Sequence, residues 1–319
     1  MKTPGLVINF FWIILFFIIG IFFWNKKKDA YDDTLLPPCF RISAPMHHYF
    51  EPNCSGSFSI FNQTINYSIN EDGLRDRSRK EIKEKQVLVL GDSMVEGWGL
   101  PQSKTISREL ENHFASSLGY QFINAGIRYS GPILQSVRAQ QLLDIYKPKK
   151  ILWFLTENDL ADDRFSYALA TKFDENHVPS EFSIKDFEDT KWVENFQFLQ
   201  KISPALFRLL RQEAYKKSVN RIVNETLDYP VCAGIQRLEQ NALKQGVDIF
   251  YIILPLGEKK IQDISALVKC IAADHIIDIR ESLNTHKEYF FPNNIHFNEK
   301  GVDAAVSFIA DDIKRFLSK

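Results

Sequence analysis

The sequence lacks the features that mark several large classes of protein. It has no Walker loop, no G-x-G-x-x-G turn and no cysteine and histidine cluster at metal-ligand spacing, so it predicts no nucleotide cofactor and no metal ion. The formal net charge is -1 and no stripe of basic residues occurs outside the N-terminus, which argues against nucleic acid as a partner. Internal repeats and low-complexity tracts are also missing. The 319 residues therefore suit about one large domain with attachments.

Cysteine is scarce too, and its distribution is informative. The four residues form two pairs that are close in sequence, Cys39 with Cys54 and Cys232 with Cys270. Two such pairs predict two disulfides, as in proteins of an oxidising compartment. Free cysteines buried in the core are the alternative, because spacing alone does not fix connectivity.

Charge is absent from one stretch near the N-terminus, residues 6–24 (LVINFFWIILFFIIGIFFW). At about 1.5 Å per residue, this stretch is long enough to cross the hydrocarbon core of a membrane. Asn25 and three lysines follow it, rather than a small-residue cleavage site. We therefore predict an uncleaved signal anchor, a single transmembrane helix, with a cleaved signal peptide as the alternative.

Two signals disagree about the side of the membrane on which the body lies. The lysines at residues 26–28 outnumber Lys2 and the amino terminus, so a positive-inside count leans by one charge towards the cytosol. The paired cysteines instead favour a periplasmic or cell-surface location. We predict an extracytoplasmic body from the cysteines.

The chain has three predicted parts: an anchor at residues 1–28, a juxtamembrane lead-in at residues 29–85 and a main domain at residues 86–319. Alternating apolar residues between Phe58 and Ile69 predict one or two short strands in the lead-in, which we expect to pack on the main domain. The regular pattern of the main domain breaks at about residues 160–228. That interval is too long for a connection and predicts an insertion beside the active edge.

In the rest of the main domain, apolar strands alternate with amphipathic helices. This pattern predicts an α/β fold in three layers, α/β/α, with a five-stranded, mostly parallel sheet covered on both faces. The predicted strands are residues 86–90, 121–124, 151–155, 248–254 and 275–279. The predicted helices are residues 104–118, 134–146, 232–245, 260–273 and 299–317, with a further helical run at about 192–210.

The first of these strands runs directly into Gly91, Asp92 and Ser93. A buried strand that ends in a small polar triplet delivers a serine to the carboxyl edge of the sheet, where open α/β sheets keep their chemistry. We expect Asp92 to fix the turn by accepting backbone N–H groups, rather than to act as a catalytic acid.

Further polar motifs follow later strands. Together they are Gly91-Asp92-Ser93, Asn124-Ala125-Gly126, Glu157-Asn158-Asp159 and, before the last helix, His296. Their order resembles the four blocks of the SGNH/GDSL hydrolase family over about residues 86–319, with the insertion unmatched. The NEDGLRD segment at residues 70–76 also looks like the lead-in of one branch of such proteins. Each motif alone is weak, and four in order form a strong signal for the fold.

The resemblance implies a role for each residue. Ser93 would be the nucleophile and His296 the general base that takes its proton. The oxyanion hole would consist of the Ser93 N–H, the Gly126 N–H and the Asn158 side-chain amide. Taken singly, each residue also has a structural interpretation, as a helix cap, a tight turn, a loop hydrogen bond or a surface histidine.

Two positions depart from the family pattern. Asn293 stands where the family usually has an aspartate three residues before the histidine, and Thr156 stands where a glycine is usual. An amide can orient the imidazole but stabilises imidazolium less than a carboxylate does, and it can hold the wrong tautomer. We predict an active Ser–His dyad helped by a backbone carbonyl, with Asn293 in the place of the acid, and a degenerate, inactive site as the alternative.

The predicted function is ester hydrolysis without cofactors, on an O-acylated carbohydrate, a cell-envelope glycan or a small ester. Two alternatives keep the fold. One is an O-acyltransferase for an envelope glycan, which would require a membrane acyltransferase as a partner. The other is a non-catalytic binding protein.

Overall fold

The computed structural model describes residues 36–82, 85–175, 177–188, 195, 204–225, 229–257, 261–271 and 275–319. One compact unit consists of residues 36–185 and 219–319, and a second unit contains residues 186–218. Across the described ranges, no helix is long and apolar enough to cross a membrane. The predicted anchor at residues 6–24 lies outside those ranges.

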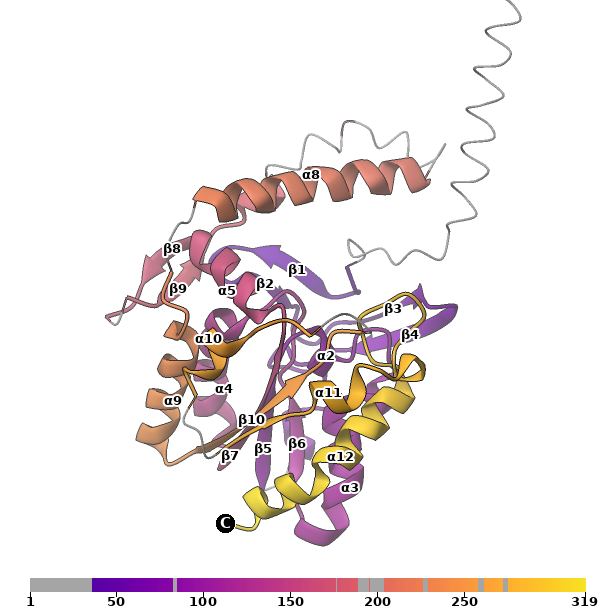
Figure 1. Ribbon diagram of the computed structural model, residues 1–319, viewed down its shortest axis with the longest axis vertical. Coiled ribbons are helices and arrows are strands. Elements are labelled where there is room, and N and C mark those ends of the chain that lie inside the picture. The colour runs from indigo at the N-terminus through magenta and orange to yellow at the C-terminus, as the bar shows by residue number, and fades with distance from the viewer. Residues whose placement is uncertain are drawn as a thin grey trace, which may run out of the picture. The chain divides into compact units, whose positions relative to one another are not determined.

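The larger unit is built on a five-stranded parallel sheet, as predicted (Figure 1). Its strand order is β11-β10-β7-β5-β6, with β5 next to the central strand β7. The strands are β5 (Gln86–Leu90), β6 (Gln121–Asn124), β7 (Lys150–Thr156), β10 (Asp248–Leu254) and β11 (Ile276–Asp278). The predicted bounds of β5, β6 and β10 are the observed ones.

Helices cover both faces of this sheet, so its central strands are apolar on both sides. Val87 and Val89 of β5 pack in one core cluster, while Leu88 and Leu90 pack in the other. Helices α3 and α12 lie over the first cluster and α4 and α9 over the second (Figure 1). These helices are α3 (Ile106–Leu118), α12 (Glu299–Leu317), α4 (Pro132–Tyr146) and α9 (Ala233–Gln245).

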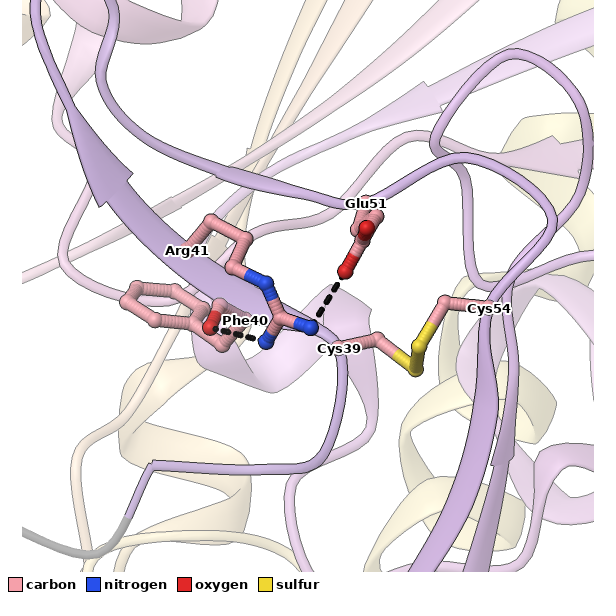
Figure 2. The surroundings of a disulfide bond; sticks show 5 residues. All are labelled: Cys39, Phe40, Arg41, Glu51 and Cys54. Carbon is pink, nitrogen blue, oxygen red and sulfur yellow. Dashed lines mark hydrogen bonds and ion pairs between the residues drawn. A yellow bond between two sulfur atoms is a disulfide. The ribbon is translucent and has the colours of Figure 1, made fainter.

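The lead-in forms two antiparallel hairpins, which confirms the prediction of short strands. The first pairs β1 (Phe40–Ser43) with β2 (His47–Phe50), and the second pairs β3 (Ser55–Ile60) with β4 (Gln63–Ser68). The predicted Cys39–Cys54 disulfide joins the two hairpins (Figure 2). The Arg41–Glu51 ion pair beside it is half exposed, so it contributes little to stability.

The segment predicted as an insertion contains regular structure. Helix α5 (Asp159–Ala168) follows β7 closely, and β8 (Ala170–Phe173) pairs antiparallel with β9 (Pro179–Phe182). Helices α6 (Lys185–Glu188) and α8 (Pro204–Glu225) come next. Of the helical run predicted at 192–210, residues 192–194 and 196–203 lie outside the described residues.

The helix predicted over residues 260–273 is wrong for most of its length. Within the described part of that range, only α10 (Ser265–Val268) is α-helical. The Gln262 carbonyl accepts a hydrogen bond from the Arg280 guanidinium, and Asp263 accepts the Ser265 N–H. These contacts hold residues 261–264 out of the helix. The second predicted disulfide, Cys232–Cys270, ties the residue before α9 to the turn after α10.

Short elements complete the larger unit. They are α2 (Ser93–Glu96), α11 (Arg280–Leu283) and the 3₁₀ turns at Arg79–Glu81, Gln102–Lys104 and Lys287–Tyr289.

Candidate active site

Ser93 is the first residue of α2, immediately after the turn that ends β5. Asp92 caps this helix, since its Oδ1 accepts the Met94 N–H at 2.8 Å, which is the role predicted for it. A Cβ at Gly91 would lie 2.5 Å from a Val95 methyl, so the turn requires glycine. As a first-turn residue of the helix, Ser93 has a backbone N–H without an intrahelical acceptor.

His296 lies opposite Ser93, although 203 residues separate them in sequence. Its Nε2 is 2.7 Å from Ser93 Oγ. The histidine belongs to a loop closed by a backbone bridge between Phe290 and Phe297, directly before α12. Its side chain is buried while that of Ser93 is half-buried, so the hydroxyl is the more accessible of the two.

The residue that orients His296 is Asn294 and not Asn293 as predicted. Asn294 Oδ1 lies 2.7 Å from His296 Nδ1 and also accepts the backbone N–H of His296 at 2.9 Å. Asn293 has a φ of 55° at the reversal of the loop, and its side chain is exposed. The turn therefore brings the second asparagine, rather than the first, to the imidazole.

This arrangement fixes the tautomer of the imidazole. The backbone N–H of His296 can only donate, so the Asn294 atom that it contacts must be the amide oxygen. The same oxygen contacts Nδ1, which must therefore carry a hydrogen. Nε2 is left with a lone pair directed at the Ser93 hydroxyl, as a general base requires.

Burial, together with the charge of the nearby Arg128 guanidinium, lowers the pKa of His296 to about 3. The imidazole is therefore neutral at ordinary pH, which suits proton abstraction.

No family model and no curated protein matches the chain. Among solved structures, it is similar to the psychrotrophic esterase EstA from Pseudoalteromonas sp., with 13% identity, a TM-score of 0.45 and coverage of 74% of this chain and 100% of the other. It is also similar to a GDSL-like lipase from Bacteroides thetaiotaomicron VPI-5482, with 13% identity, a TM-score of 0.39 and coverage of 72% of this chain and 88% of the other. A third similar structure is the acetylxylan esterase Axe2 from Geobacillus stearothermophilus, with 13% identity, a TM-score of 0.35 and coverage of 72% of this chain and 94% of the other.

Of the three predicted SGNH oxyanion donors, Gly126 is already engaged. Its N–H donates to Asn124 Oδ1 at 3.0 Å. A Cβ at Gly126 would lie 2.2 Å from the Glu96 nitrogen, so the glycine allows the loop after β6 to pack against the backbone of α2. For Gly126 to serve the oxyanion, its N–H must be shared with Asn124 or released from it.

The Asn158 amide is held on both sides. Its Nδ2 donates to Asp162 Oδ2 at 2.5 Å, and its Oδ1 lies 2.8 Å from the Thr156 hydroxyl. The Asn158 side chain also contacts Asp92, so the second amide hydrogen must be shared between Asp92 and a substrate oxyanion. Among the described residues, no group of three or more His, Cys, Asp or Glu side chains could hold a metal ion.

Sequence reasoning missed three residues of this site: Asn294, Asp162 and Arg128. The sequence did contain a signal for Asn294. It lies two residues before His296, and an asparagine at that spacing commonly accepts the N–H of the later residue in an Asx turn. Asp162 and Arg128 had none, since single charged residues are usually solvated. Arg128 is instead buried, with its guanidinium 3.6 Å from the centre of the Trp98 ring.

Proposed function

We propose that this chain is a serine ester hydrolase of the SGNH/GDSL type. The observation that carries the proposal is the 2.7 Å contact between Ser93 Oγ and His296 Nε2, at the carboxyl end of a buried parallel strand. The proposal needs no cofactor, because serine, imidazole and amide groups suffice for acyl transfer to water.

The reaction uses the dyad twice. Ser93 Oγ attacks the ester carbonyl carbon while His296 Nε2 takes the hydroxyl proton, and a tetrahedral oxyanion forms. The Ser93 N–H and the shared Asn158 N–H stabilise its charge. The imidazolium then gives its proton to the departing alcohol. Water then attacks the acyl carbonyl carbon while the same imidazole takes its proton, and a second tetrahedral oxyanion forms. When this oxyanion collapses, the bond to Ser93 Oγ breaks, the acid leaves, and the imidazolium returns its proton to Ser93 Oγ.

The substrate class and location belong to this proposal. We infer an O-acyl group on a carbohydrate or cell-envelope glycan, with residues 6–24 as a membrane anchor and the body outside the cytoplasm. Both cysteine pairs are oxidised, which supports an oxidising compartment.

A fluorophosphonate probe tests the assignment of the nucleophile. Ser93→Ala should abolish both labelling and the hydrolysis of p-nitrophenyl acetate, with little change in Tm, because a half-buried hydroxyl contributes little to folding. Ser117→Ala, which removes a helix-surface serine, is the matched control and should label like the parent chain. Labelling without net hydrolysis would favour acyl transfer to a glycan. A parent chain that neither labels nor hydrolyses would leave only a binding role.

A further inference from the structure

A continuous chain of buried polar contacts lies behind the Asn158 amide. Asp92 Oδ2 is 3.0 Å from the Thr156 hydroxyl, and that hydroxyl is 2.8 Å from Asn158 Oδ1. Asn158 Nδ2 is in turn 2.5 Å from Asp162 Oδ2. Thr156 is the centre of this chain, and it is the residue that departs from the glycine usual in the third block.

Hydrogen counting constrains the protonation of this chain. The Thr156 hydroxyl has one hydrogen but contacts two oxygens, an amide oxygen and a carboxylate oxygen, neither of which can donate. The contacts are all satisfied when Asp92 carries a proton. Asp92 then donates to Thr156, Thr156 donates to Asn158 Oδ1, and Asn158 Nδ2 donates to Asp162. Turning the Asn158 amide over reverses each bond and moves the proton to Asp162, so either orientation needs one carboxyl proton.

The surroundings favour that proton. Asp92 and Thr156 are buried, and the acidic groups that face Asp92 are Glu96 on α2 with Asp159 and Asp162 on α5. Burial raises the pKa of Asp92 to about 6, although the contacts of Asp92 with the Met94 N–H and with the Thr156 and Asn158 side chains lower it. Burial and the neighbouring Asp92 raise the pKa of Asp162 to about 7.

We propose that Thr156, bonded within a chain that holds one carboxyl proton, is a positioning residue that orients the Asn158 amide towards the substrate oxyanion. This role rests on the proposed hydrolase function. Without the hydroxyl, Asn158 Oδ1 would lose its contact with Thr156, and only the contacts of the Asn158 side chain with Asp162 and Asp92 would restrain the amide. Losing an oxyanion donor costs about 10²–10³ in kcat, so loosening one should cost less.

Thr156→Val tests the proposal because it removes the hydroxyl and keeps the shape. We expect kcat for p-nitrophenyl acetate to fall by about tenfold to a hundredfold, with KM within about threefold, since the amide acts on the transition state. The fluorophosphonate labelling rate should fall in parallel. Thr156→Ser should recover most of kcat. Thr105→Val, which removes another buried threonine hydroxyl, is the control for loss of stability and should keep the parent kcat.

The outcomes separate this proposal from the hydrolase assignment. A Ser93-dependent parent activity that Thr156→Val leaves unchanged would overturn the positioning role alone. The carboxyl proton has a readout that needs no activity, the infrared carbonyl band of a protonated carboxyl group at neutral pH. Burial also raises the pKa of Asp159 and Asp163, so the test is a difference between chains: the band should lose intensity in Asp92→Asn and in Asp162→Asn relative to the parent. An unchanged band in both variants would overturn the proposed proton, even in a chain that hydrolyses no ester.

Discussion

Among the single residues, Asn294 sets the orientation and the tautomer of the His296 imidazole. Its one amide oxygen accepts both the backbone N–H and the Nδ1–H of His296. The ring is therefore held in the productive tautomer. The positive charge that forms on the imidazole during attack has no carboxylate partner in this contact, which predicts slow turnover.

Asn294→Asp should supply that partner. An aspartate at this position can accept the same two hydrogen bonds and stabilise imidazolium, so we expect kcat to rise by about tenfold or more, with about 10⁴ as an upper bound. The carboxylate should also raise the pKa of His296 from about 3, which would move the acidic limb of the kcat/KM profile to higher pH. Measuring pH–rate profiles for both forms checks both effects.

The neighbouring asparagine provides the control. Asn293→Asp places the same charge on an exposed side chain at the loop reversal, so the profile should stay close to that of the parent. If Asn293→Asp raised turnover and Asn294→Asp did not, our assignment of the orienting residue would be wrong.

Among the secondary-structure elements, the β3–β4 hairpin packs against the loop that carries Phe291 and His296. Phe61, at the turn of this hairpin, stacks on Phe291 with ring centroids 4.1 Å apart. Phe291 in turn donates its N–H to the His296 carbonyl. Gln63 of β4 donates to the Gly99 carbonyl, which ties the same hairpin to the segment after α2. The lead-in therefore contacts the loop that bears His296 and the segment that follows the Ser93 helix.

Phe61→Ala should weaken catalysis through this contact. Loss of the stack, worth about 0.5–1.5 kcal/mol for an aromatic pair, should loosen the loop and lower kcat by about threefold to tenfold. Phe61→Tyr keeps the ring and should behave like the parent. Steady-state kinetics with parallel Tm measurements check this: a lower Tm with an unchanged kcat would mean that the stack stabilises the fold without positioning His296.

At the scale of the whole molecule, the two disulfides close loops of different length. Cys39 and Cys54 are 15 residues apart, whereas Cys232 and Cys270 are 38 apart. In the chain-entropy model, longer loops give more stabilisation because cross-linking them removes more freedom from the unfolded chain.

Replacing each cysteine pair by alanine should therefore lower the free energy of unfolding by unequal amounts. We expect a loss of about 3 kcal/mol for Cys39/Cys54 and about 4 kcal/mol for Cys232/Cys270. Urea unfolding of both variants, beside the reduced parent chain, measures this. A reduced parent as stable as the oxidised one would show that the bridges add nothing.

Local features of the sequence were enough to predict most of the sheet and the pairing of Ser93 with His296. The bounds of β5, β6 and β10 follow from short apolar runs between turn residues, and α12 follows from its regular apolar spacing. These features are local, so they can be read without knowing what packs on them. The order of Ser93, Gly126, Asn158 and His296, and the pairing of the cysteines, were likewise present in the sequence.

The pairing of polar groups, by contrast, depends on contacts between residues that are far apart in the sequence. Asn293 and Asn294 are chemically identical, and the choice between them depends on a loop reversal next to α12. Asp92 and Thr156 are 64 residues apart and meet because their strands are neighbours in the sheet. The orientation of a hydrogen bond depends on the whole packed environment, since a buried polar group takes the partner that the fold brings within reach. For that reason the proximity of Ser93 and His296 was predictable, while the residues that orient them were not.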